Sequence, residues 1–363
     1  MKQLIRILHT EASVGWGGQE IRILRESLGM ISRGYKVSVA APEQSMIFRR
    51  AKDSGIECFP AGFKKKSLSS LTGMISLLNR EHFDIVNTHS SSDSWIASIA
   101  AKLSTKRPKI IRTRHLATPI SRSVLSRLIY NVLPDAVMTT GEQIRRNMME
   151  KNGFDGSRII SVPTGTDLEI FCPDKIVPSL KPSGFAIGMI GVLRSWKGHR
   201  FFVESMPEIL KHIPEAMFYI VGEGPIKQNV AGLVDALPFR DRVFMTGHRE
   251  DIPEIMASME VIVHPSYANE GIPQSLLQAM AMERPVVASD AGAIKDIVFD
   301  GETGFLIEPM RPDLLAEKVV ELYNDPGLRK KFGKRGRELV EREYSFELML
   351  NKIEEIYRRL LDK

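Results

Sequence analysis

The length, composition and charge of the chain set its first limits. It has 363 residues, of which 43% are hydrophobic and 26% charged, so it is long enough for two domains with buried cores and too apolar for a disordered chain. Two cysteines cannot form a disulfide framework, the first residues are too polar for a signal peptide, and no apolar run approaches the roughly 20 residues that span a bilayer. We therefore expect a two-domain protein of the cytoplasm.

The formal net charge of +6 is unevenly distributed along the chain. Residues 1–170 contain 25 Lys and Arg against 15 Asp and Glu, whereas residues 171–363 contain 25 against 29. A basic half favours an anionic partner such as a phosphate or an acidic lipid surface. Nucleic acid is disfavoured because the basic residues lack interleaved aromatic residues. A solvated basic face explains the same excess equally well, and both interpretations stay open.

The first half alternates short apolar runs with helical patterns. Residues 4–8 form an apolar run that ends at a glycine-rich turn, and apolar residues then recur at helical spacing from Ile21 to Ile31. Gly34 lies where a helix would end, and residues 37–41 form the next apolar run. Further strands are expected at residues 85–87, 109–113, 136–140 and 158–162.

The same pattern returns in the second half. Residues 185–192 form an apolar strand that ends in a turn at residues 193–198, and a helical pattern follows. The next strands are expected at residues 217–221, 243–246, 261–264, 285–289 and 304–307. Strands that alternate with helices indicate parallel sheets, and short apolar strands fit a sheet that is covered on both faces.

A stretch rich in Pro, Ser and Gly, residues 176–184, separates the two halves and is interpreted as a linker. We expect an N-terminal domain at residues 1–175 and a C-terminal domain at residues 184–344, each a doubly wound, Rossmann-like α/β domain. Residues 345–363 are expected to form one helix with Ser345 as N-cap, and we expect this helix to pack back on the N-terminal domain.

Each half has a turn after its first strand that suits phosphate binding. Gly17 and Gly18 precede a helix, so backbone N–H groups and the helix dipole are available to an anion. Glu20 stands where the dinucleotide fingerprint needs its last glycine, which disfavours a nicotinamide- or flavin-dependent oxidoreductase. In the second half, Arg194 and Lys197 can close together on a diphosphate. An unliganded tight turn and a surface charge cluster are the structural alternatives.

The most specific stretch is residues 269–280, which follows the strand at 261–264. Glu270 can accept hydrogen bonds from sugar hydroxyls, Gly271 permits close approach of the backbone, and Pro273 suits the start of a helix. The N–H groups of residues 272–276 are expected to point at a bound anion. An acidic residue that only complements the helix dipole is the alternative interpretation.

Together these motifs resemble the retaining glycosyltransferases with the GT-B fold, in the large family 4 group that includes sucrose synthases and bacterial mannosyl- and glucosyltransferases. The resemblance covers nearly the whole chain, and it is carried by Gly17-Gly18 with Glu20, Arg194 with Lys197-Gly198, and residues 221–225, 270–280, 290–292 and 301–306. It implies two Rossmann-like domains that face each other across a cleft. The acceptor would bind the N-terminal domain and the donor the C-terminal domain.

The resemblance also implies a role for each matching residue. Glu270 corresponds to a glutamate that binds a hydroxyl of the donor sugar, and Arg194 and Lys197 correspond to a pair on the donor diphosphate. Gln278 replaces the family's second glutamate, which binds the ribose, so the charge-assisted bond to a ribose hydroxyl is lost. The other implied donor-binding residues are Gly17, Gly18, Gly222, Gly247, His248, Gly271, Ile272, Pro273 and Ser275.

Histidines at strand ends supply further candidates. His115 resembles the family's active-site histidine, which contacts the donor sugar or the leaving phosphate, and it joins Glu270, Arg194 and Lys197 in the implied catalytic set. The acceptor-side candidates are Glu20, His89 and Arg114. A lone histidine at a strand end is otherwise a structural residue. No metal-ligand spacing is present, and the resemblance implies neither a metal nor a cofactor, because the nucleotide-sugar is a substrate.

The implied function is retaining transfer of a hexose or related sugar from a nucleotide-sugar to a hydroxyl of a glycan or lipid-linked acceptor, in polysaccharide or lipopolysaccharide synthesis. Lys64, Lys65 and Lys66 precede an amphipathic pattern at residues 68–78, which suggests peripheral contact with the inner face of an anionic membrane. A helix packed on its own sheet is the alternative. A GT-B sugar-nucleotide epimerase and a non-catalytic nucleotide-sugar-binding protein are the competing functions.

Overall fold

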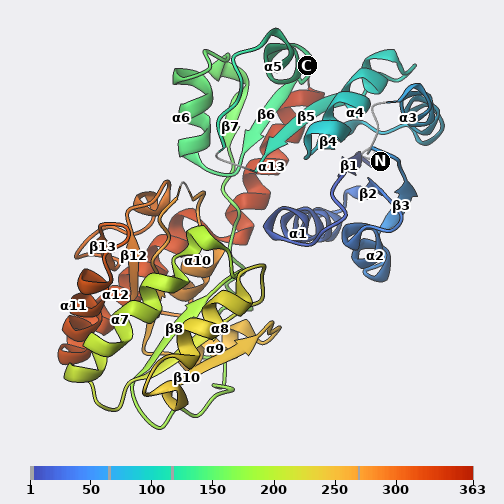
Figure 1. Cartoon of the computed structure of the whole chain (residues 1–363). Coiled ribbons are helices and arrows are strands. Elements are labelled where there is room, and N and C mark those ends of the chain that lie inside the picture. The colour runs from blue at the N-terminus through green and yellow to red at the C-terminus, as the bar shows by residue number, and fades with distance from the viewer. Residues whose placement is uncertain (1–3, 64–66, 116–117, 269, 363) are drawn as a thin grey trace. The chain divides into compact units, whose positions relative to one another are not determined.

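The computed structural model describes residues 4–63, 67–115, 118–268 and 270–362, and the chain folds into two compact units (Figure 1). The first contains Met1–Thr164 together with Leu348–Lys363, and the second contains Gly165–Glu347. The first unit therefore ends before the expected boundary at residue 175. The reason is that Phe171 is buried in the hydrophobic core of the second unit.

The predicted linker at residues 176–184 is also part of the second unit. Ile176 and Leu180 pack against its core. The backbone N–H of Leu180 donates to Ser258 Oγ at 3.0 Å, and that of Ser179 donates to the Glu254 carbonyl at 3.2 Å. The Pro, Ser and Gly content of this stretch marks an irregular but packed segment, so the prediction of a linker was wrong.

Within the described residues, the first unit is built on a seven-stranded parallel sheet in the order β3-β2-β1-β4-β5-β6-β7. Its strands are β1 (Arg6–Thr10), β2 (Lys36–Ala41), β3 (Glu57–Pro60), β4 (Ile85–Thr88), β5 (Lys109–Arg114), β6 (Ala136–Thr139) and β7 (Ile159–Ser161). The edge strand β3 was not predicted, because it is short, begins with a charged residue and ends in proline. Such features are typical of sheet edges.

The helices of the first unit connect these strands. They are α1 (Gly18–Ser32), α2 (Met46–Asp53), α3 (Leu68–Glu81), α4 (Ser91–Leu103), α5 (Val124–Arg127), the π-helical turn η1 (Leu128–Val132), α6 (Glu142–Glu150) and the 3₁₀ turn η2 (Gly156–Arg158). The last helix of the chain, α13 (Phe346–Leu361), belongs to this unit from Leu348 onward. On this helix, Glu354 accepts from Arg33 at 3.2 Å and from the Tyr35 hydroxyl at 3.0 Å.

Both faces of this sheet are buried, as the short apolar runs predicted. On β2, Ala40 packs into one hydrophobic cluster with helices α3 and α4, whereas its neighbours Val39 and Ala41 pack into another with α1 and α2. Successive side chains of a strand point to opposite faces. The first unit is therefore a doubly wound α/β layer structure.

The second unit repeats this plan on a six-stranded parallel sheet, counted over the described residues, in the order β10-β9-β8-β11-β12-β13. The strands are β8 (Ala186–Ile190), β9 (Met217–Val221), β10 (Val243–Gly247), β11 (Val261–His264), β12 (Val286–Ser289) and β13 (Phe305–Ile307). The helices are α7 (His199–His212), α8 (Lys227–Asp235), α9 (Ile252–Ala257), α10 (Gln274–Ala281), α11 (Pro312–Asn324) and α12 (Pro326–Glu343), with 3₁₀ turns η3 (Ser195–Lys197), η4 (Arg240–Arg242) and η5 (Ile294–Asp296).

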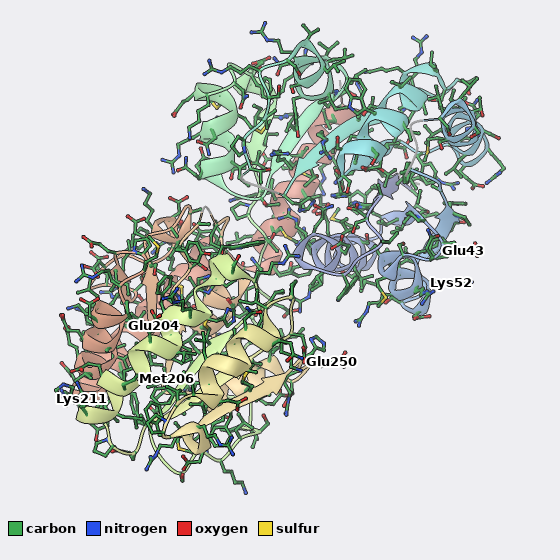
Figure 2. All side chains as sticks on the ribbon, viewed as in Figure 1. Glu43, Lys52, Glu204, Met206, Lys211 and Glu250 are labelled. Atoms are coloured by element: carbon green, nitrogen blue, oxygen red, sulfur yellow. The ribbon has the colours of Figure 1, made fainter. Side chains whose placement is uncertain are left out.

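Helix α7 illustrates how these helices cover the sheet. Met206 is fully buried in the core of the second unit, whereas Glu204 and Lys211 on the same helix are exposed (Figure 2). On β11, Val261 and Val263 face the same cluster as Met206, and Ile262 faces the cluster on the other side of the sheet. Polar and apolar residues at helical spacing therefore fix which side of α7 meets the sheet.

None of the helices in the described part of the chain is long and apolar enough to cross a membrane. Among the same residues, no group of three or more His, Cys, Asp and Glu side chains is arranged to hold a metal ion.

Candidate active site

The second unit brings two predicted residues into direct contact. Lys197 Nζ lies 2.8 Å from Glu270 Oε1, although the two residues are far apart in the sequence. They lie on the loops that follow β8 and β11, which are neighbours in the sheet. The two side chains are 19% and 11% exposed, so the pair is open to a ligand but shielded from bulk water. The carboxyl ends of neighbouring parallel strands meet at one sheet edge, where α/β domains bind ligands.

Buried polar residues orient the Glu270 carboxylate. Ser266 Oγ donates to Glu270 Oε1 at 2.9 Å and lies 3.1 Å from His264 Nε2. Because the single hydroxyl proton of Ser266 is used on Glu270, His264 must donate its Nε2–H to Ser266. Burial, followed by the nearby charge of Lys197, holds the pKa of His264 well below its usual value. His264 is therefore a neutral ring that supports Ser266 and, through it, Glu270.

Two glycines allow the backbone to bring this pair together. Gly198 has φ +78°, and a Cβ there would lie 1.8 Å from the Pro265 carbonyl oxygen. Gly292 has φ +68°, and a Cβ there would lie 2.3 Å from the Glu270 carbonyl oxygen, which accepts from the Ala293 N–H at 3.0 Å. Any larger residue at either position would push the Lys197 or the Glu270 loop away.

Arg194 occupies the same loop as Lys197 but a different environment. It is exposed, and its guanidinium carbon lies 5.1 Å from the centre of the Trp196 ring, a cation–π contact. The Trp196 carbonyl in turn accepts from the Tyr267 N–H at 2.9 Å, which ties this loop to the one that carries Glu270. Arg194 therefore packs against Trp196 at the surface, whereas Lys197 contacts Glu270.

The predicted glycines after β9 and β10 hold the neighbouring loops close together. The Gly222 N–H donates to the Gly247 carbonyl at 2.9 Å, and a Cβ on Gly222 would lie 1.9 Å from the Gly191 carbonyl oxygen. Gly247 has φ +71°, and the next residue, His248, is exposed. These glycines are required by the packing of the loops themselves.

Helix α10 begins at Gln274, a few residues after Glu270, with Pro273 as its N-cap residue. Among residues 272–276, whose free N–H groups were expected to point at an anion, Pro273 has no N–H and the Leu276 N–H donates to the Pro273 carbonyl at 3.2 Å. A Cβ on Gly271 would meet no protein atom within 4 Å, so the fold itself does not require glycine there. Of the remaining candidates, Ile272, Ser275 and Gln278 are half-buried. Asn269 lies outside the described residues.

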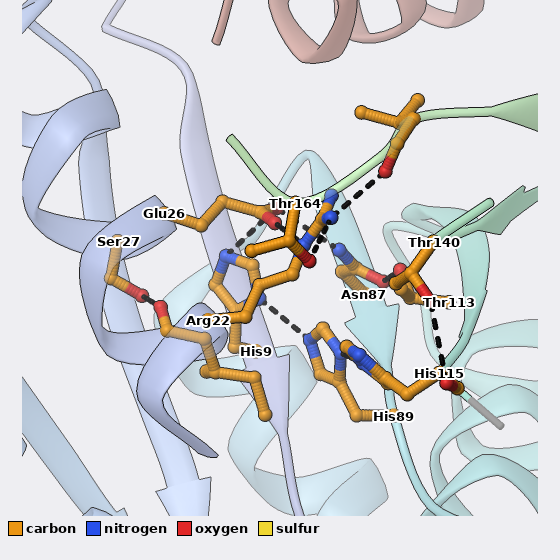
Figure 3. Close-up of polar contacts among 12 residues, drawn as sticks. His9, Arg22, Glu26, Ser27, Asn87, His89, Thr113, His115, Thr140 and Thr164 are labelled. Atoms are coloured by element: carbon orange, nitrogen blue, oxygen red, sulfur yellow. Dashed lines mark hydrogen bonds and ion pairs between the residues drawn. The ribbon is translucent and has the colours of Figure 1, made fainter. Parts of the chain in front are cut away.

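In the first unit, three histidines form a hydrogen-bonded chain (Figure 3). His9 Nδ1 lies 2.9 Å from His89 Nε2, and His89 Nδ1 lies 2.9 Å from His115 Nε2. His9 is in β1, His89 follows β4 and His115 follows β5, and these three strands are adjacent in the sheet. Only His115 is partly exposed, because His9 and His89 are 0% and 2% exposed.

This burial changes the interpretation of His89. It was a candidate for contact with the acceptor, but both of its ring nitrogens are occupied by the other two histidines and almost none of its surface is accessible. Direct contact with a substrate is therefore excluded by the geometry. Burial lowers the pKa of His9 and holds the pKa of His89 and His115 well below the usual value. All three rings are neutral near pH 7.

An ion pair lies at the inner end of the chain of histidines. Glu26 and Arg22, four residues apart on α1, are 0% and 1% exposed, and Arg22 Nε lies 3.4 Å from Glu26 Oε2. Arg22 Nη1 also donates to the Val162 carbonyl at 2.8 Å and to Thr164 Oγ1 at 2.9 Å. The Oε1 atom of Glu26 lies 4.0 Å from His9 Nε2.

The glycine turn before α1 is shaped by two acidic residues. Gly17 is the N-cap residue of α1 and Gly18 its first residue; Gly18 is exposed, whereas Glu20 in the first turn is only 6% exposed. Glu11, which is fully buried at the end of β1, accepts from the Ser13 N–H at 2.7 Å and bonds Gln19 and Ser90. Glu20, expected on the acceptor side, is buried, and a Cβ on Gly17 would lie 3.5 Å from its Oε2 atom.

Arg114 contributes to a cavity of about 450 Å³ at the end of β5. Its Nη1 donates to the Tyr130 hydroxyl at 3.1 Å and its Nη2 to the Thr118 carbonyl at 2.6 Å. Arg112 lines the same cavity, and no acidic side chain is among its described lining residues, which also include Trp95 and Leu125. The cavity therefore combines two cations with apolar walls.

Several residues of these sites were not predicted from the sequence. In the second unit they are Ser266, His264 and Gly292; in the first they are His9, Arg22, Glu26 and Glu11. The one available signal was His9, a polar residue inside an apolar strand next to its carboxyl end. Lys64, Lys65 and Lys66, the predicted basic cluster, lie outside the described residues.

Comparison with known proteins identifies the family. The Glycosyltransferase Family 4 profile matches residues 16–170, and the Glycosyl transferases group 1 profile matches residues 184–325. A curated relative, the UDP-Gal:α-D-GlcNAc-diphosphoundecaprenol α-1,3-galactosyltransferase of Escherichia coli, is 28% identical over 311 residues, which is 80% of this chain and 79% of the relative.

Solved structures agree on the fold. A glycosyltransferase from Rickettsia africae superposes with a TM-score of 0.88 at 21% identity and covers 99% of both chains. The Anabaena protein HepE, solved in complex with UDP-glucose, superposes with a TM-score of 0.83 at 17% identity over 98% of this chain and 100% of that one. With two parallel-sheet units and a family match in each, the chain belongs to the family 4 glycosyltransferases and has the GT-B fold.

Proposed function

We propose that this glycosyltransferase moves a hexose or related sugar from a nucleotide-sugar to a hydroxyl of a glycan or lipid-linked acceptor, with retention of anomeric configuration and without a metal ion. The observation that carries the proposal is the contact of Lys197 with Glu270 at 2.8 Å, at the carboxyl ends of β8 and β11. At this place a cation that can bind phosphate lies next to a carboxylate that can bind hydroxyls. A nucleotide-sugar presents these two kinds of group next to each other.

In this proposal the leaving group determines the chemistry of the second unit. When the glycosidic bond breaks, negative charge grows on the nucleoside diphosphate, and groups placed in advance at that charge stabilise the transition state. Lys197 and Arg194 supply full positive charges, and the start of α10 supplies the positive end of a helix dipole. These groups take the part that a metal ion plays in other enzymes, so we expect transfer to continue in the presence of a chelator.

Glu270 would hold the donor sugar through its hydroxyls. Its carboxylate is fixed by Ser266, and its backbone is fixed by Ala293 and Gly292. When substrate binds, Lys197 would exchange its contact with Glu270 for the diphosphate, and both residues would then have a ligand partner. The anomeric configuration is retained if the acceptor hydroxyl attacks the anomeric carbon from the same face from which the diphosphate departs. The hydroxyl proton then passes to a phosphate oxygen.

The first unit would bind the acceptor. Its cavity with Arg112 and Arg114 accommodates an anionic group against apolar walls, which fits an acceptor that carries phosphate and lipid. The E. coli relative acts on a diphosphoundecaprenol-linked sugar, and an acceptor of that class would bring both features. Peripheral contact with an anionic membrane belongs to the same proposal; flotation with vesicles with and without anionic lipid tests it, and equal binding to both would contradict it.

The test begins with the donor. A panel of sugar nucleotides is screened by thermal shift, since a ligand at about 100 times its Kd adds roughly 2.7 kcal/mol to the stability of the folded protein. The nucleotide-sugar that stabilises the chain is then incubated with and without lipid-linked acceptors, in the presence of EDTA, and the anomeric configuration of the product is read by NMR.

The possible outcomes separate the proposed function from its competitors. Acceptor-dependent consumption of the donor with an α-linked product from an α-linked donor supports retaining transfer. Conversion of the donor to another sugar nucleotide without acceptor would indicate an epimerase, and tight binding without any turnover would indicate a non-catalytic binding protein. Either of these outcomes would overturn the proposal.

A further inference from the structure

The chain of histidines in the first unit has two free ends. The contacts His9–His89 and His89–His115 occupy one ring nitrogen of His9, both of His89 and one of His115 (Figure 3). The remaining nitrogens are His9 Nε2 at the inner end, which has no hydrogen-bond partner in the described structure, and His115 Nδ1 at the outer end. His115 is the partly exposed member.

Because each ring is neutral, it carries one N–H and one lone pair. A hydrogen bond between two imidazoles needs the N–H of one and the lone pair of the other. In a chain of three rings the bonds must therefore all run in the same direction. Either His115 donates inward through Nε2–H, or it carries its proton on Nδ1 and accepts from His89.

The inner end selects one of these directions. His9 Nε2 lies 4.0 Å from Glu26 Oε1, inside fully buried surroundings. Glu26 is paired with Arg22 and also accepts from the Tyr357 hydroxyl at 3.4 Å and from Asn87 Nδ2 at 3.5 Å, as an ionised carboxylate does. A carboxylate attracts an N–H and repels a lone pair, and low local polarity strengthens this preference. The proton of His9 therefore belongs on Nε2.

The opposing charges do not reverse this preference. Arg22 approaches Glu26 through Oε2, whereas His9 faces Oε1. The charges that act on His115 at the outer end are those of Arg22 and of Arg112 and Arg114 on β5, and a cation there favours an exposed lone pair over an exposed N–H on His115. The charges at both ends therefore favour the same direction.

We propose that Glu26, His9 and His89 are positioning residues that fix His115 in the Nε2–H tautomer and present its Nδ1 lone pair as a hydrogen-bond acceptor for a sugar hydroxyl. In this arrangement His9 donates towards Glu26, His89 donates to His9, and His115 donates to His89. The functional part rests on the proposed transfer reaction, whereas the tautomer is a property of the folded chain alone. No proton is transferred along the chain; its role is orientation.

The tautomer is read directly by ¹⁵N NMR of the full-length protein labelled at its histidine rings. A protonated ring nitrogen and a bare one have well-separated ¹⁵N shifts, and the His115 signals are assigned from the spectrum of His115→Gln. We expect the proton of His115 on Nε2 and a bare Nδ1. A proton on Nδ1 in the wild-type chain would overturn the proposal without any variant.

Glu26→Gln tests the cause. The amide has the shape of the carboxylate but can turn an N–H towards His9, so we expect part or all of the His115 population to shift to the Nδ1–H tautomer. Tyr357→Phe is the matched control, because it removes one donor to Glu26 and leaves its charge and its bond to Arg22 in place. We expect the tautomer to be unchanged in this control.

Kinetics then distinguish positioning from a purely structural role. In Glu26→Gln we expect kcat/KM for the nucleotide-sugar to fall roughly tenfold, as for one lost hydrogen bond, with unchanged affinity for the nucleoside diphosphate, which lacks the sugar. An unshifted tautomer, or a shifted tautomer with unchanged kcat/KM, would overturn the proposal. If the wild-type chain consumes no nucleotide-sugar, the proposed function fails, while the NMR result still decides the tautomer.

Discussion

The two units position their polar groups in different ways. In the first, His9, His89 and Glu26 are buried and are held by bonds between side chains. In the second, Lys197 and Arg194 stand on an open loop, and the path of the backbone at glycines decides where they lie. Glu270 in the second unit is also oriented by the Ser266 and His264 side chains, but the two cations of that unit are placed by the main chain, whereas the histidines of the first unit are held by side chains.

The difference follows from the charge that each group must carry. A buried group is stable when it is neutral or fully paired, which is the state of the histidines and of Glu26 with Arg22. A cation that is to meet a diphosphate must keep its charge and remain accessible until the ligand arrives. The four predictions below test this contrast, and they begin with the largest expected effect.

Lys197→Ala should reduce sugar transfer by about 100-fold or more, because it removes a full positive charge from the leaving diphosphate. The folded protein should keep most of its thermal stability, because Ser266 still donates to Glu270 after Lys197 is removed. The measurements are kcat with the identified donor and Tm without ligand. Lys211→Ala, which alters an exposed ion pair on α7, is the control and should change neither. Wild-type turnover in Lys197→Ala would contradict the proposed role.

Arg22→Met should destabilise the first unit by about 3–5 kcal/mol, because it leaves the buried Glu26 carboxylate without its cation. Urea unfolding followed by circular dichroism measures this loss. The second unit offers a control of the same spacing: Arg200 and Glu204 also lie four residues apart on one helix, but are 71% and 36% exposed. Arg200→Met should cost no more than about 1 kcal/mol. Equal losses would show that burial is not the deciding factor.

Asp93→Asn should change how stability depends on pH. Burial raises the pKa of Asp93 to about 7, while its carboxylate accepts from Thr10 Oγ1 at 2.8 Å and from the His89 N–H at 2.9 Å. Between about pH 4 and 7 the folded state holds a proton that the unfolded state has released, so the contribution of Asp93 to stability falls as the pH rises and is constant above pH 7.

The stability advantage of the Asn variant over the wild type should therefore grow from pH 4 to 7, as measured by urea unfolding at a series of pH values. Asp155→Asn is a control of opposite sign, because hydrogen bonds from Ser157 lower the pKa of the exposed Asp155. The stability that Asp155→Asn removes should be constant above about pH 4 and should shrink only where the solution is more acidic. An advantage of Asp93→Asn that is independent of pH would refute the raised pKa.

Gln278→Glu should have the smallest effect. Gln278 is half-buried on α10, and a carboxylate there would restore the charge-assisted bond to a ribose hydroxyl that the family resemblance implies. We expect affinity for the nucleoside diphosphate to rise about fivefold, measured by titration calorimetry, with little change in kcat. Weaker binding would mean that the glutamine is matched to the nucleotide used by this chain.

Local sequence was sufficient for most of the fold. Apolar runs such as β9 and β11 were predicted with the observed bounds, because a strand buried on both faces is recognised from its own residues. The same reasoning failed at the edge strand β3 and at residues 176–184, where polar and Pro-rich composition concealed regular pairing and close packing. Composition describes only the residues of the segment itself, whereas the packing of the segment depends on neighbours that are distant in the sequence.

The candidate residues likewise divide into those that the sequence predicted and those that only the structure reveals. The sequence alone predicted the two parallel-sheet domains, the glycines at the turns, and the candidates Lys197 and Glu270 from local patterns, whereas His115 became a candidate through the family resemblance. Only the tertiary structure decided that Lys197 touches Glu270 and that His89 is enclosed between two other histidines. The physical reason is the sheet order, since residues at the carboxyl ends of parallel strands become neighbours only after crossover helices have placed those strands side by side.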